Sequence, residues 1–304
     1  MKLATYKING EPRIGLVVGD KVADLAAAYV AMANKQDFDL ESIPTDMASF
    51  LALEKAMEIV RQVETQLVQA VCWSKDVTYP LDKVTLMAPI LRPGKIICIG
   101  LNYIDHAKEG GHPLPKEPVI FGKFANAVIG PEDAIRCPDP AVSDAIDYEA
   151  ELAVVIGKRA YRVDKTTALD YVAGYLNFND ISARDLQHRD GQWMKGKFLD
   201  TFAPMGPWLV TKEEIADPGN LKIQLRLNGQ VMQSSNTGNL IFDVPHLVSY
   251  LSSLVTLEPG DIIATGTPSG VGFVRKPPVL LKPGDVVEVE IEGLGVLRNH
   301  VIQG

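Results

Sequence analysis

Residues 147–156 read DYEAELAVVI, and this stretch does most to decide the predicted fold. Its first half places Asp147, Glu149 and Glu151 at every second position, so that on a strand their side chains share one face. The alternation stops at Leu152, and the rest is apolar on both faces, which is typical of a strand that enters a covered sheet. The sequence therefore predicts a buried strand with carboxylates at its mouth.

A second stretch, VEVEIE at 287–292, has nearly the same composition. Its glutamates alternate strictly with valine and isoleucine until the strand ends at Gly293. Such a pattern is usually that of an edge strand with one face in water. We therefore predict a solvent-facing edge strand here, and we reserve a functional role for the acids of the first stretch.

Composition and charge narrow the classes of partner. The chain has 304 residues, 46% hydrophobic and 22% charged, as in an ordinary globular protein with ample material for a core. Its net charge of −8 would repel nucleic acids and anionic membranes, so we expect neither as a partner. No apolar run approaches the roughly 18 residues of a membrane span, and no signal peptide is evident at the N-terminus. Three cysteines without CxxC spacing (Cys72, Cys98 and Cys137) predict reduced thiols and a cytoplasmic location.

Turn and proline signals divide the chain near residue 92. The N-terminal segment alternates apolar and polar positions around turns, and then shows helical spacing over 45–70, with Thr45 or Asp46 as the candidate N-cap. Three prolines interrupt any periodicity after that. The predicted domains are a small N-terminal α/β domain at 1–92 and a larger domain at 93–304.

The larger domain is predicted to consist mainly of strands. Apolar or alternating stretches indicate strands at 95–100, 149–156, 206–211, 221–227, 261–265 and 285–299. One helix is expected at 243–254, beginning at Asp243 with Pro245 in its first turn. The predicted fold class is therefore α+β, with strands dominant.

The paired glutamates point to a metal. Two neighbouring carboxylates repel each other, and a buried carboxylate is costly unless it is paired or bound to a cation. A hard divalent ion such as Mg²⁺, Mn²⁺ or Ca²⁺ resolves both problems with oxygen ligands. Asp180, which follows the apolar run YVAGYLNF, is the best candidate for a third ligand. A cap or turn residue is the other interpretation of Asp180, because Asp, Ser and Asn cluster there.

A histidine and a glutamate three residues apart suggest a general base. In NYIDHAKEGG, His106 and Glu109 share a face if the stretch forms a helical turn, and the carboxylate would then orient the imidazole to activate water. Gly110 and Gly111 would end the turn and leave a loop that can act as a lid. A solvated surface turn is the plainer interpretation, and the pattern by itself favours it.

Two further stretches carry candidate anion-binding groups. Lys195 and Lys197 flank a glycine before an aromatic residue, and either is a plausible anchor for a substrate carboxylate, although most lysines are merely solvated. GTPSGVG at 266–272 lacks the endings of a P-loop and of a nucleophile elbow, but Thr267 and nearby N–H groups could line a site for an anionic oxygen.

Five separated motifs together resemble the fumarylacetoacetate hydrolase superfamily. They are IGLNYIDHAKE, DYEAELAVVIGK, NFNDISARDLQ, KGKFLDTFAPMGPWLV and ATGTPSGVG. They are most similar to the bacterial single-protein branch of acylpyruvate hydrolases, hydroxyheptadienedioate and carboxymethyl-hydroxymuconate isomerases, and oxaloacetate decarboxylases. The resemblance extends over about residues 93–300. Fumarylacetoacetate hydrolases proper carry a further acidic ligand just before the histidine, and CIGLNY has none before Asp105, which favours the small-substrate branch.

The resemblance implies a mixed β-sandwich roll, a homodimer and one divalent ion, Mg²⁺ or Mn²⁺. The metal ligands of the family fall on Glu149, Glu151 and Asp180. Its other site residues fall on the catalytic His106, Glu109 and Lys197 and the substrate-binding Arg184, Gln187 and Thr267.

The leading functional hypothesis is metal-dependent hydrolysis of a C–C bond in a 2,4-dioxo acid, of the kind found in aromatic catabolism. His106, oriented by Glu109, would deprotonate water, the cation would stabilise the pyruvate enolate, and Lys197 would anchor a carboxylate. The alternative uses the same enolate in a 2-oxo acid isomerase or decarboxylase, or in a hydrolase or lyase of a 2-keto-3-deoxy sugar acid. A non-catalytic metal-binding or ligand-binding module is the third hypothesis. The expected partner is a small 2-oxo acid.

Overall fold

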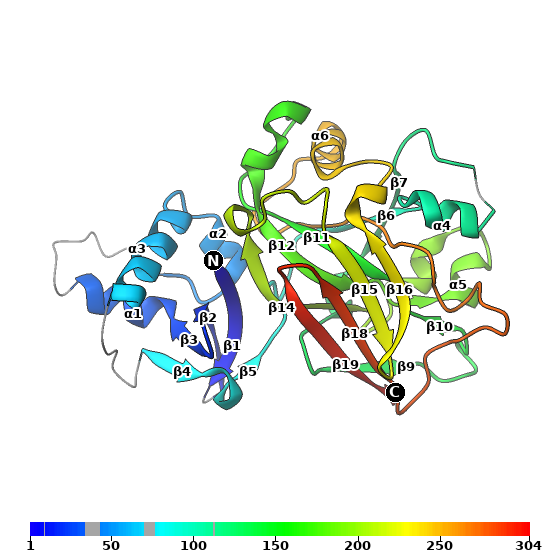
Figure 1. Ribbon diagram of the computed structural model, residues 1–304, viewed down its shortest axis with the longest axis horizontal. Coiled ribbons are helices and arrows are strands. Elements are labelled where there is room, and N and C mark those ends of the chain that lie inside the picture. The colour runs from blue at the N-terminus through cyan, green and yellow to red at the C-terminus, as the bar shows by residue number, and fades with distance from the viewer. Residues whose placement is uncertain (9, 34–42, 70–76, 112) are drawn as a thin grey trace.

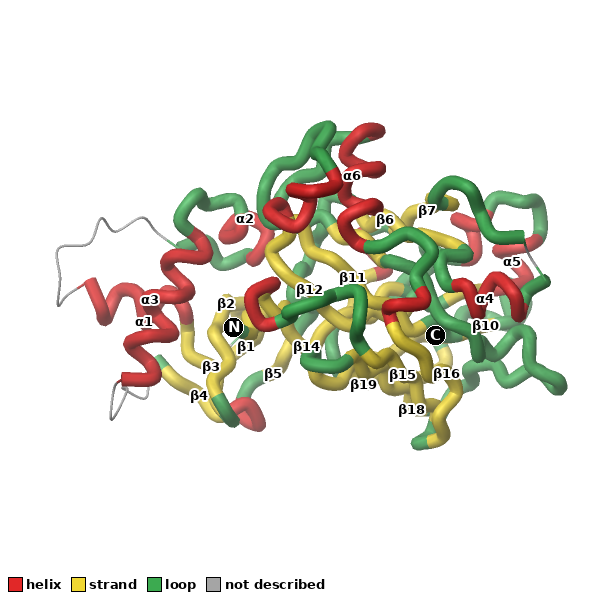
Figure 2. Tube along the Cα trace, turned by 45° about the horizontal axis from the view of Figure 1, so that its top comes forward, coloured by secondary structure: helices red, strands yellow, loops and turns green. Residues whose placement is uncertain are grey.

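The computed structural model describes residues 1–304 except 9, 34–42, 70–76 and 112. Its strands form one large mixed sheet, a five-stranded sheet and a two-stranded sheet, with helices around them (Figure 1). Figure 2 shows the same arrangement from a view turned forward, with strands through the centre of the molecule and helices at its outside. The predicted α+β class with strands dominant is confirmed.

The large sheet runs through both predicted domains. In pairing order its strands are β4 (Thr78–Pro80), β3 (Lys21–Asp24), β2 (Glu11–Val18), β1 (Lys2–Ile8), β14 (Ala203–Thr211), β12 (Val172–Asn179), β11 (Ala150–Ile156), β17 (Ile262–Ala264), β6 (Ile96–Gly100) and β7 (Val119–Lys123). At its side, β5 (Thr85–Leu86) pairs with β1 and β8 (Val128–Ile129) pairs with β14. The β1–β14 pairing joins Leu3 to Leu209, so the sheet is continuous across the predicted boundary near residue 92, and that boundary stays a prediction.

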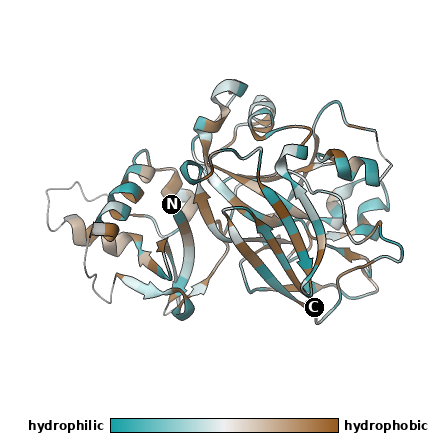
Figure 3. Cartoon of the chain, viewed as in Figure 1, coloured by the Kyte–Doolittle hydropathy of each residue, from teal (hydrophilic) through white to brown (hydrophobic). Residues whose placement is uncertain are grey.

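A second sheet covers the middle of the first. Its strands are β16 (Gln230–Asn236), β15 (Lys222–Leu227), β18 (Val286–Ile291), β19 (Gly295–Gln303) and β9 (Ala134–Cys137). In Figure 1 its yellow and red strands lie in front of β11, β12 and β14, and contacts between the two sheets make a sandwich. Hydrophobic and hydrophilic residues alternate along these strands (Figure 3), because one face packs inward and the other meets water. The predicted sandwich is thus present.

Helices and short turns connect and cover these sheets. The α-helices are α1 (Leu25–Ala33), α2 (Met47–Leu51), α3 (Ala56–Gln69), α4 (Ile104–Glu109), α5 (Arg184–His188) and α6 (Val244–Leu254). The described residues also contain six 3₁₀ turns: η1 (Leu81–Lys83), η2 (Ala125–Ala127), η3 (Lys165–Tyr171), η4 (Trp193–Gly196), η5 (Lys212–Glu214) and η6 (Thr237–Asn239). The small sheet pairs β10 (Ile146–Asp147) with β13 (Ser182–Ala183). Across the described residues, no helix is both long and apolar enough to span a membrane.

Two predicted elements need correction. The single helix expected over 45–70 is two helices, because turns that run from Phe50 to Leu53 and from Leu53 to Ala56 interrupt it. Asp46, one of the two candidate N-caps, caps the first of these helices, α2. Residue 70, the expected end of the helix, lies outside the described residues. The strand expected at 285–299 is a hairpin of β18 and β19, and β18 lies between β15 and β19 and is not an edge strand.

The remaining predicted strands and the helix at 243–254 are present within a few residues of their expected bounds. The Asp243 side chain accepts a hydrogen bond from the His246 N–H, which caps α6 as expected. Cys98 and Cys137 are buried free thiols, whereas Cys72 lies outside the described residues.

Candidate active site

The pairing of β11 with β12 brings the three predicted metal ligands together. All seven residues of β11 are buried, since β12 and β17 flank it and the second sheet covers it. Ala150 lies opposite Asn179, and the Asp180 N–H donates to the Glu149 carbonyl at 2.9 Å. This register places one carboxylate oxygen each of Glu149, Glu151 and Asp180 within 4.8 Å of one another.

Lys197 lies between two of these carboxylates. Its Nζ is 2.8 Å from Glu149 Oε2 and 2.9 Å from Asp180 Oδ2, and its side chain is buried. Burial alone would raise the pKa of Glu149, but the charges of Lys197 and Arg184 lower it well below its usual range. Glu149 is therefore held in its charged form, in which its oxygens can bind a metal ion.

A second buried lysine, Lys123 at the end of β7, supports the same acid. Its Nζ is 2.7 Å from Asp180 Oδ1 and also donates to the carbonyls of Ile181 and Phe202. Burial lowers the pKa of Lys123, and the Asp180 charge opposes that change. The sequence does not single out Lys123, because a lone lysine at the end of a short strand has no distinguishing pattern.

The charge of the buried Glu151 carboxylate is stabilised in a different way. Its Oε2 accepts a hydrogen bond from the Gly266 N–H at 2.9 Å, and no lysine or arginine of the described chain forms an ion pair with it. Burial raises the pKa of Glu151 well above its usual range, and the charges of Asp180 and Glu149 raise it further. A divalent cation would supply the missing positive charge, so the three-carboxylate donor set fits such an ion.

Arg184 extends the charged cluster away from the sheet. Its Nη1 is 2.6 Å from Glu149 Oε1 and donates to Gln187 Oε1 at 3.0 Å. Its Nε and Nη2 lie 2.9 and 2.8 Å from Asp147 Oδ2. Asp147, the first of the three alternating acids, is therefore the fully buried partner of Arg184.

The expected helical turn is α4, and it brings His106 to the same cavity as Glu149 and Glu151. His106 Nδ1 is 3.7 Å from Glu109 Oε2, and both Glu109 oxygens accept from the Gly270 N–H, at 3.0 and 3.1 Å. Burial would raise the pKa of Glu109, but the nearby His106 imidazole and the Gly270 N–H lower it. Glu109 is thus held as an anion beside the imidazole.

The loop at 266–273 binds three of the acids in and around this cluster. Its N–H groups donate to Glu151 from Gly266, to Glu109 from Gly270, and to Asp147 from residues 272 and 273. Gly266 and Gly270 have φ values of +106° and +100°, which L side chains rarely adopt. The glycines of GTPSGVG therefore serve backbone geometry and close packing, and they do not form a phosphate loop.

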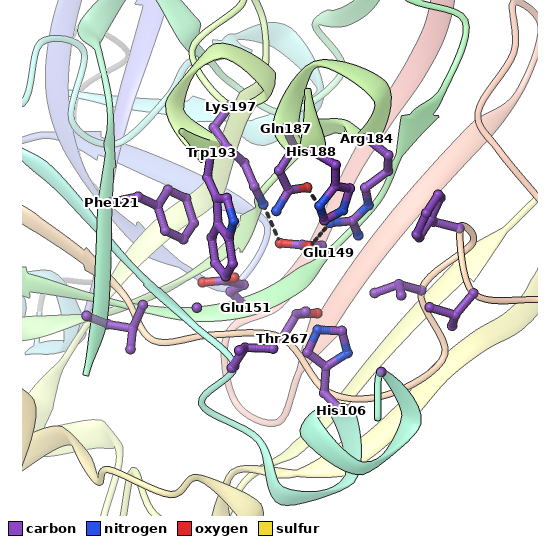
Figure 4. Close-up of a pocket in the computed structure, with 17 residues that line it drawn as sticks. His106, Phe121, Glu149, Glu151, Arg184, Gln187, His188, Trp193, Lys197 and Thr267 are labelled. Atoms are coloured by element: carbon purple, nitrogen blue, oxygen red, sulfur yellow. Dashed lines mark hydrogen bonds and ion pairs between the residues drawn. The ribbon is translucent and has the colours of Figure 1, made fainter. Parts of the chain in front are cut away.

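Figure 4 shows how the cavity is arranged. Lys197, Gln187 and Arg184 lie along one side, His106 lies on the opposite side, and Glu149, Glu151 and Thr267 lie between them.

Aromatic residues close one wall of this cavity. Trp193 meets Phe121 edge to face at 5.7 Å between ring centroids, and Lys197 Nζ lies 4.9 Å from the centre of the Phe121 ring. A Cβ at position 100 would lie 2.2 Å from Trp193, so Gly100 permits this packing. The sequence signalled neither aromatic residue.

The two lysines of the KGK motif have different roles. Lys197 is in the charged cluster, whereas Lys195 is half-exposed and pairs with Asp190 on the surface. Gly196 separates them, and a side chain there would collide with the Ala183 carbonyl. All nine predicted site residues lie in or beside one cavity, while their catalytic and binding roles stay predictions.

Comparison with known proteins decides the family. The family model described as fumarylacetoacetate (FAA) hydrolase C-terminal matches residues 95–302. The chain belongs to the fumarylacetoacetate hydrolase family.

Curated relatives within this family include proteins from several eukaryotes. A fumarylacetoacetate hydrolase domain-containing protein 2 homolog of Dictyostelium discoideum is 47% identical over 321 residues, covering 99% of this chain and 97% of its own. The oxaloacetate tautomerase FAHD2A, mitochondrial, of Bos taurus is 50% identical over 265 residues, covering 86% and 81%. These names differ from the acylpyruvate hydrolase branch that the motifs suggested.

Solved structures agree with the fold. A fumarylacetoacetate hydrolase from Exiguobacterium antarcticum superposes with a TM-score of 0.81 at 34% identity over the whole of both chains. Maleylpyruvate hydrolase from Sphingobium sp. SYK-6, in complex with manganese(II) and pyruvate, has a TM-score of 0.77 at 30% identity, also over both whole chains. The carboxylate trio together with this relative's manganese indicates a divalent metal site.

Proposed function

We propose that this protein is a metal-dependent tautomerase that interconverts the keto and enol forms of a small 2-oxo dicarboxylic acid, with oxaloacetate as substrate. The observation that carries the proposal is the single cavity in which Glu149, Glu151 and Lys197 face His106. Such a site can hold a 2-oxo acid and move a proton beside its carbonyl group. Relatives named oxaloacetate tautomerases, 45–52% identical to this chain, support the choice of substrate.

Glu149, Glu151 and Asp180 would hold the cation. When bound, a divalent cation lowers the energy of an enolate by accepting charge from its oxygens as a Lewis acid. Lys197 has three N–H donors, and Glu149 and Asp180 accept two of them. The third is available to a substrate oxygen, which makes Lys197 an anchor for the substrate carboxylate.

His106 would move the proton. It approaches from the side of the cavity opposite Lys197, and Glu109 lies beside its Nδ1. In the keto form, His106 takes a proton from C3, and the imidazolium then returns a proton to the oxygen on C2. One proton leaves carbon and one arrives at oxygen, so the substrate is isomerised without water or a further reactant.

C–C hydrolysis of an acylpyruvate is a second candidate function. The His106–Glu109 pair favours it, because an imidazole beside a carboxylate can also deprotonate water. Maleylpyruvate hydrolase, a relative by structure, has that reaction in its name. The two candidates share every residue of the cluster and differ in whether water enters the cavity.

The deciding experiment compares both reactions in one preparation. The metal-free protein is loaded with Mg²⁺ or Mn²⁺, and enol oxaloacetate is followed by its ultraviolet absorbance while acylpyruvates are followed by pyruvate release. We expect fast tautomerisation and little pyruvate release. Rapid pyruvate release with oxaloacetate tautomerisation at the uncatalysed rate would replace the first candidate with the second.

The role of His106 is tested separately. His106→Asn should lower turnover by roughly 10²–10⁴-fold, the usual contribution of a general base. The matched control is His300→Asn, because His300 is a half-exposed histidine of β19 far along the other sheet. Equal activities of the two variants would remove His106 from the mechanism.

Assembly is also proposed from the resemblance, and location from the pattern of cysteines. We propose a homodimer in the cytoplasm, and several relatives carry the word mitochondrial in their names. Analytical ultracentrifugation gives the mass of the assembly, and fractionation of the source cells gives the location. A monomer, or recovery from an organelle fraction, would overturn the respective part.

A further inference from the structure

A glutamine from the second sheet reaches the candidate active site. Gln233 lies on β16, is 1% exposed, and contacts two segments that line the cavity. Its Oε1 accepts from the Ala150 N–H at 2.9 Å, and its Nε2 donates to Thr267 Oγ1 and to the Pro268 carbonyl, both at 2.8 Å. Gln233 therefore joins β11, between its two acids, to the 266–273 loop.

The chemistry of the partners fixes the orientation of this amide. The Ala150 N–H can only donate, so it requires the oxygen end of the Gln233 amide. The Pro268 carbonyl can only accept, so it requires the nitrogen end. A reversed amide would lose both bonds and leave two buried backbone groups without partners, which is unfavourable.

The amide orientation determines what the Thr267 hydroxyl can do. A hydroxyl has one O–H donor and two acceptor sites, and the Gln233 N–H occupies one acceptor site of Thr267. The hydroxyl proton must point elsewhere. Thr267 lines the cavity between Glu149, Glu151 and His106, so the cavity is where that proton can be donated.

We propose that Gln233 is a positioning residue that sets Thr267 as a hydrogen-bond donor to the enolate oxygen of the substrate. The inference rests on the proposed function and assigns a role within it. A donor aimed at the atom that gains negative charge stabilises the transition state more than the bound substrate. Loss of Gln233 should therefore lower kcat more than it raises KM.

A double-mutant cycle separates this role from that of a simple strut between the sheets. The variants are Gln233→Met, Thr267→Val and the two combined, assayed for oxaloacetate tautomerisation with saturating Mg²⁺. Each single change should lower kcat roughly 10-fold or more, by loss or misorientation of one donor. The double variant should be no slower than Thr267→Val, because Gln233 acts through that hydroxyl.

Two further variants guard the interpretation. Gln233→Glu keeps the acceptor for the Ala150 N–H, but the second carboxylate oxygen would accept the Thr267 hydroxyl proton. That proton would then point away from the cavity, so kcat should fall as in Gln233→Met. Thr267→Ser retains the hydroxyl and should keep most of the activity, and adding Gln233→Met to it should restore the full loss. Gln230→Met is the control, because Gln230 is exposed on the same strand.

The result that overturns the inference is a roughly 100-fold loss in the double variant, the product of two independent losses. Oxalate, a stable enolate mimic, gives a readout without turnover when its binding to the Mn²⁺-loaded protein is measured by calorimetry. Both single variants should weaken oxalate binding, with no further loss in the double variant. Wild-type protein that neither binds oxalate nor tautomerises oxaloacetate would overturn the proposed function and this inference with it.

Discussion

Two strands of this protein begin from almost the same letters and end in different environments. At the mouth of β11, the side chain of Glu149 is 7% exposed and Glu151 is 1% exposed. On β18, the side chains of Glu288 and Glu290 are 26% and 47% exposed and pair with Arg226. Both strands are interior strands of their sheets, so the position in the sheet does not explain the difference.

What differs is the number of covered faces. β18 packs one face against the large sheet and turns the other to water, which an antiparallel sheet allows. β11 is buried at every residue, so Glu151 and the preceding Glu149 are largely withdrawn from solvent. Alternating acids alone are therefore uninformative, and the apolar run that follows them identifies the buried pair.

The largest effect is expected when the buried acid pair and the solvated acid pair are replaced in parallel. Glu149→Gln combined with Glu151→Gln should abolish metal binding and lower turnover at least roughly 10³-fold, because the enolate then lacks its Lewis acid. Glu288→Gln combined with Glu290→Gln should keep full metal content and turnover within about 2-fold, since these acids are solvated. Metal content by elemental analysis and kcat on oxaloacetate test both. Equal effects would show that the two strands are equivalent.

The same contrast between buried and solvated charges can be tested on a lysine, by measuring protein stability. Lys123→Met leaves Asp180 without one of its buried partners and should lower the free energy of unfolding by about 3–5 kcal/mol. Urea unfolding monitored by fluorescence measures the change. A loss below about 1 kcal/mol would mean that the Lys123 contact resembles a surface ion pair.

Removal of the metal should have the next largest effect. If the free ion is present at 100 times its Kd for the folded protein, chelation should lower the free energy of unfolding by about 2.7 kcal/mol. The shift should disappear in the Glu149→Gln, Glu151→Gln variant and persist when Glu288 and Glu290 are changed. Differential scanning calorimetry with and without chelator measures it, and an unchanged wild-type Tm would argue against a bound ion.

The smallest effect is expected at the surface cluster that Arg226 of β15 forms with Glu288 and Glu290 of β18. Arg226→Met should cost no more than about 1 kcal/mol, because its ion pairs with Glu288 and Glu290 are partly solvated. Raising the salt concentration should reduce even this cost, whereas the Lys123→Met effect should persist. A large, salt-independent loss of unfolding free energy would show that Arg226 contributes as much to stability as the buried Lys123.

Local patterns were enough to predict part of this molecule. The strand after Glu149, the turn that carries His106 and the cap at Asp243 each depend on neighbours in sequence, and each is present. The break in the helix predicted over 45–70 was not visible, because apolar spacing continues across it.

Long-range pairing was the part that sequence spacing could not supply. Asp180 reaches Glu149 only because Ala150 pairs with Asn179, which is a property of the β11–β12 register. Lys123 and Gln233 come from strands distant in the chain, and each is a single polar residue that elsewhere would be solvated. Asp180 and Lys197 were candidates from their sequence context, and the family resemblance assigned them roles, but neither pointed to Lys123 or Gln233.

The 266–273 loop has a consequence for protein engineering. Its amide hydrogens are shared among Glu151, Glu109 and Asp147, so an insertion there would displace a candidate metal ligand, the proposed proton-transfer pair and the partner of Arg184 at once. Libraries that aim to change substrate range should therefore leave the loop length intact. Val274, which lines the cavity just beyond the loop, and the Phe121–Trp193 wall are the better positions to diversify.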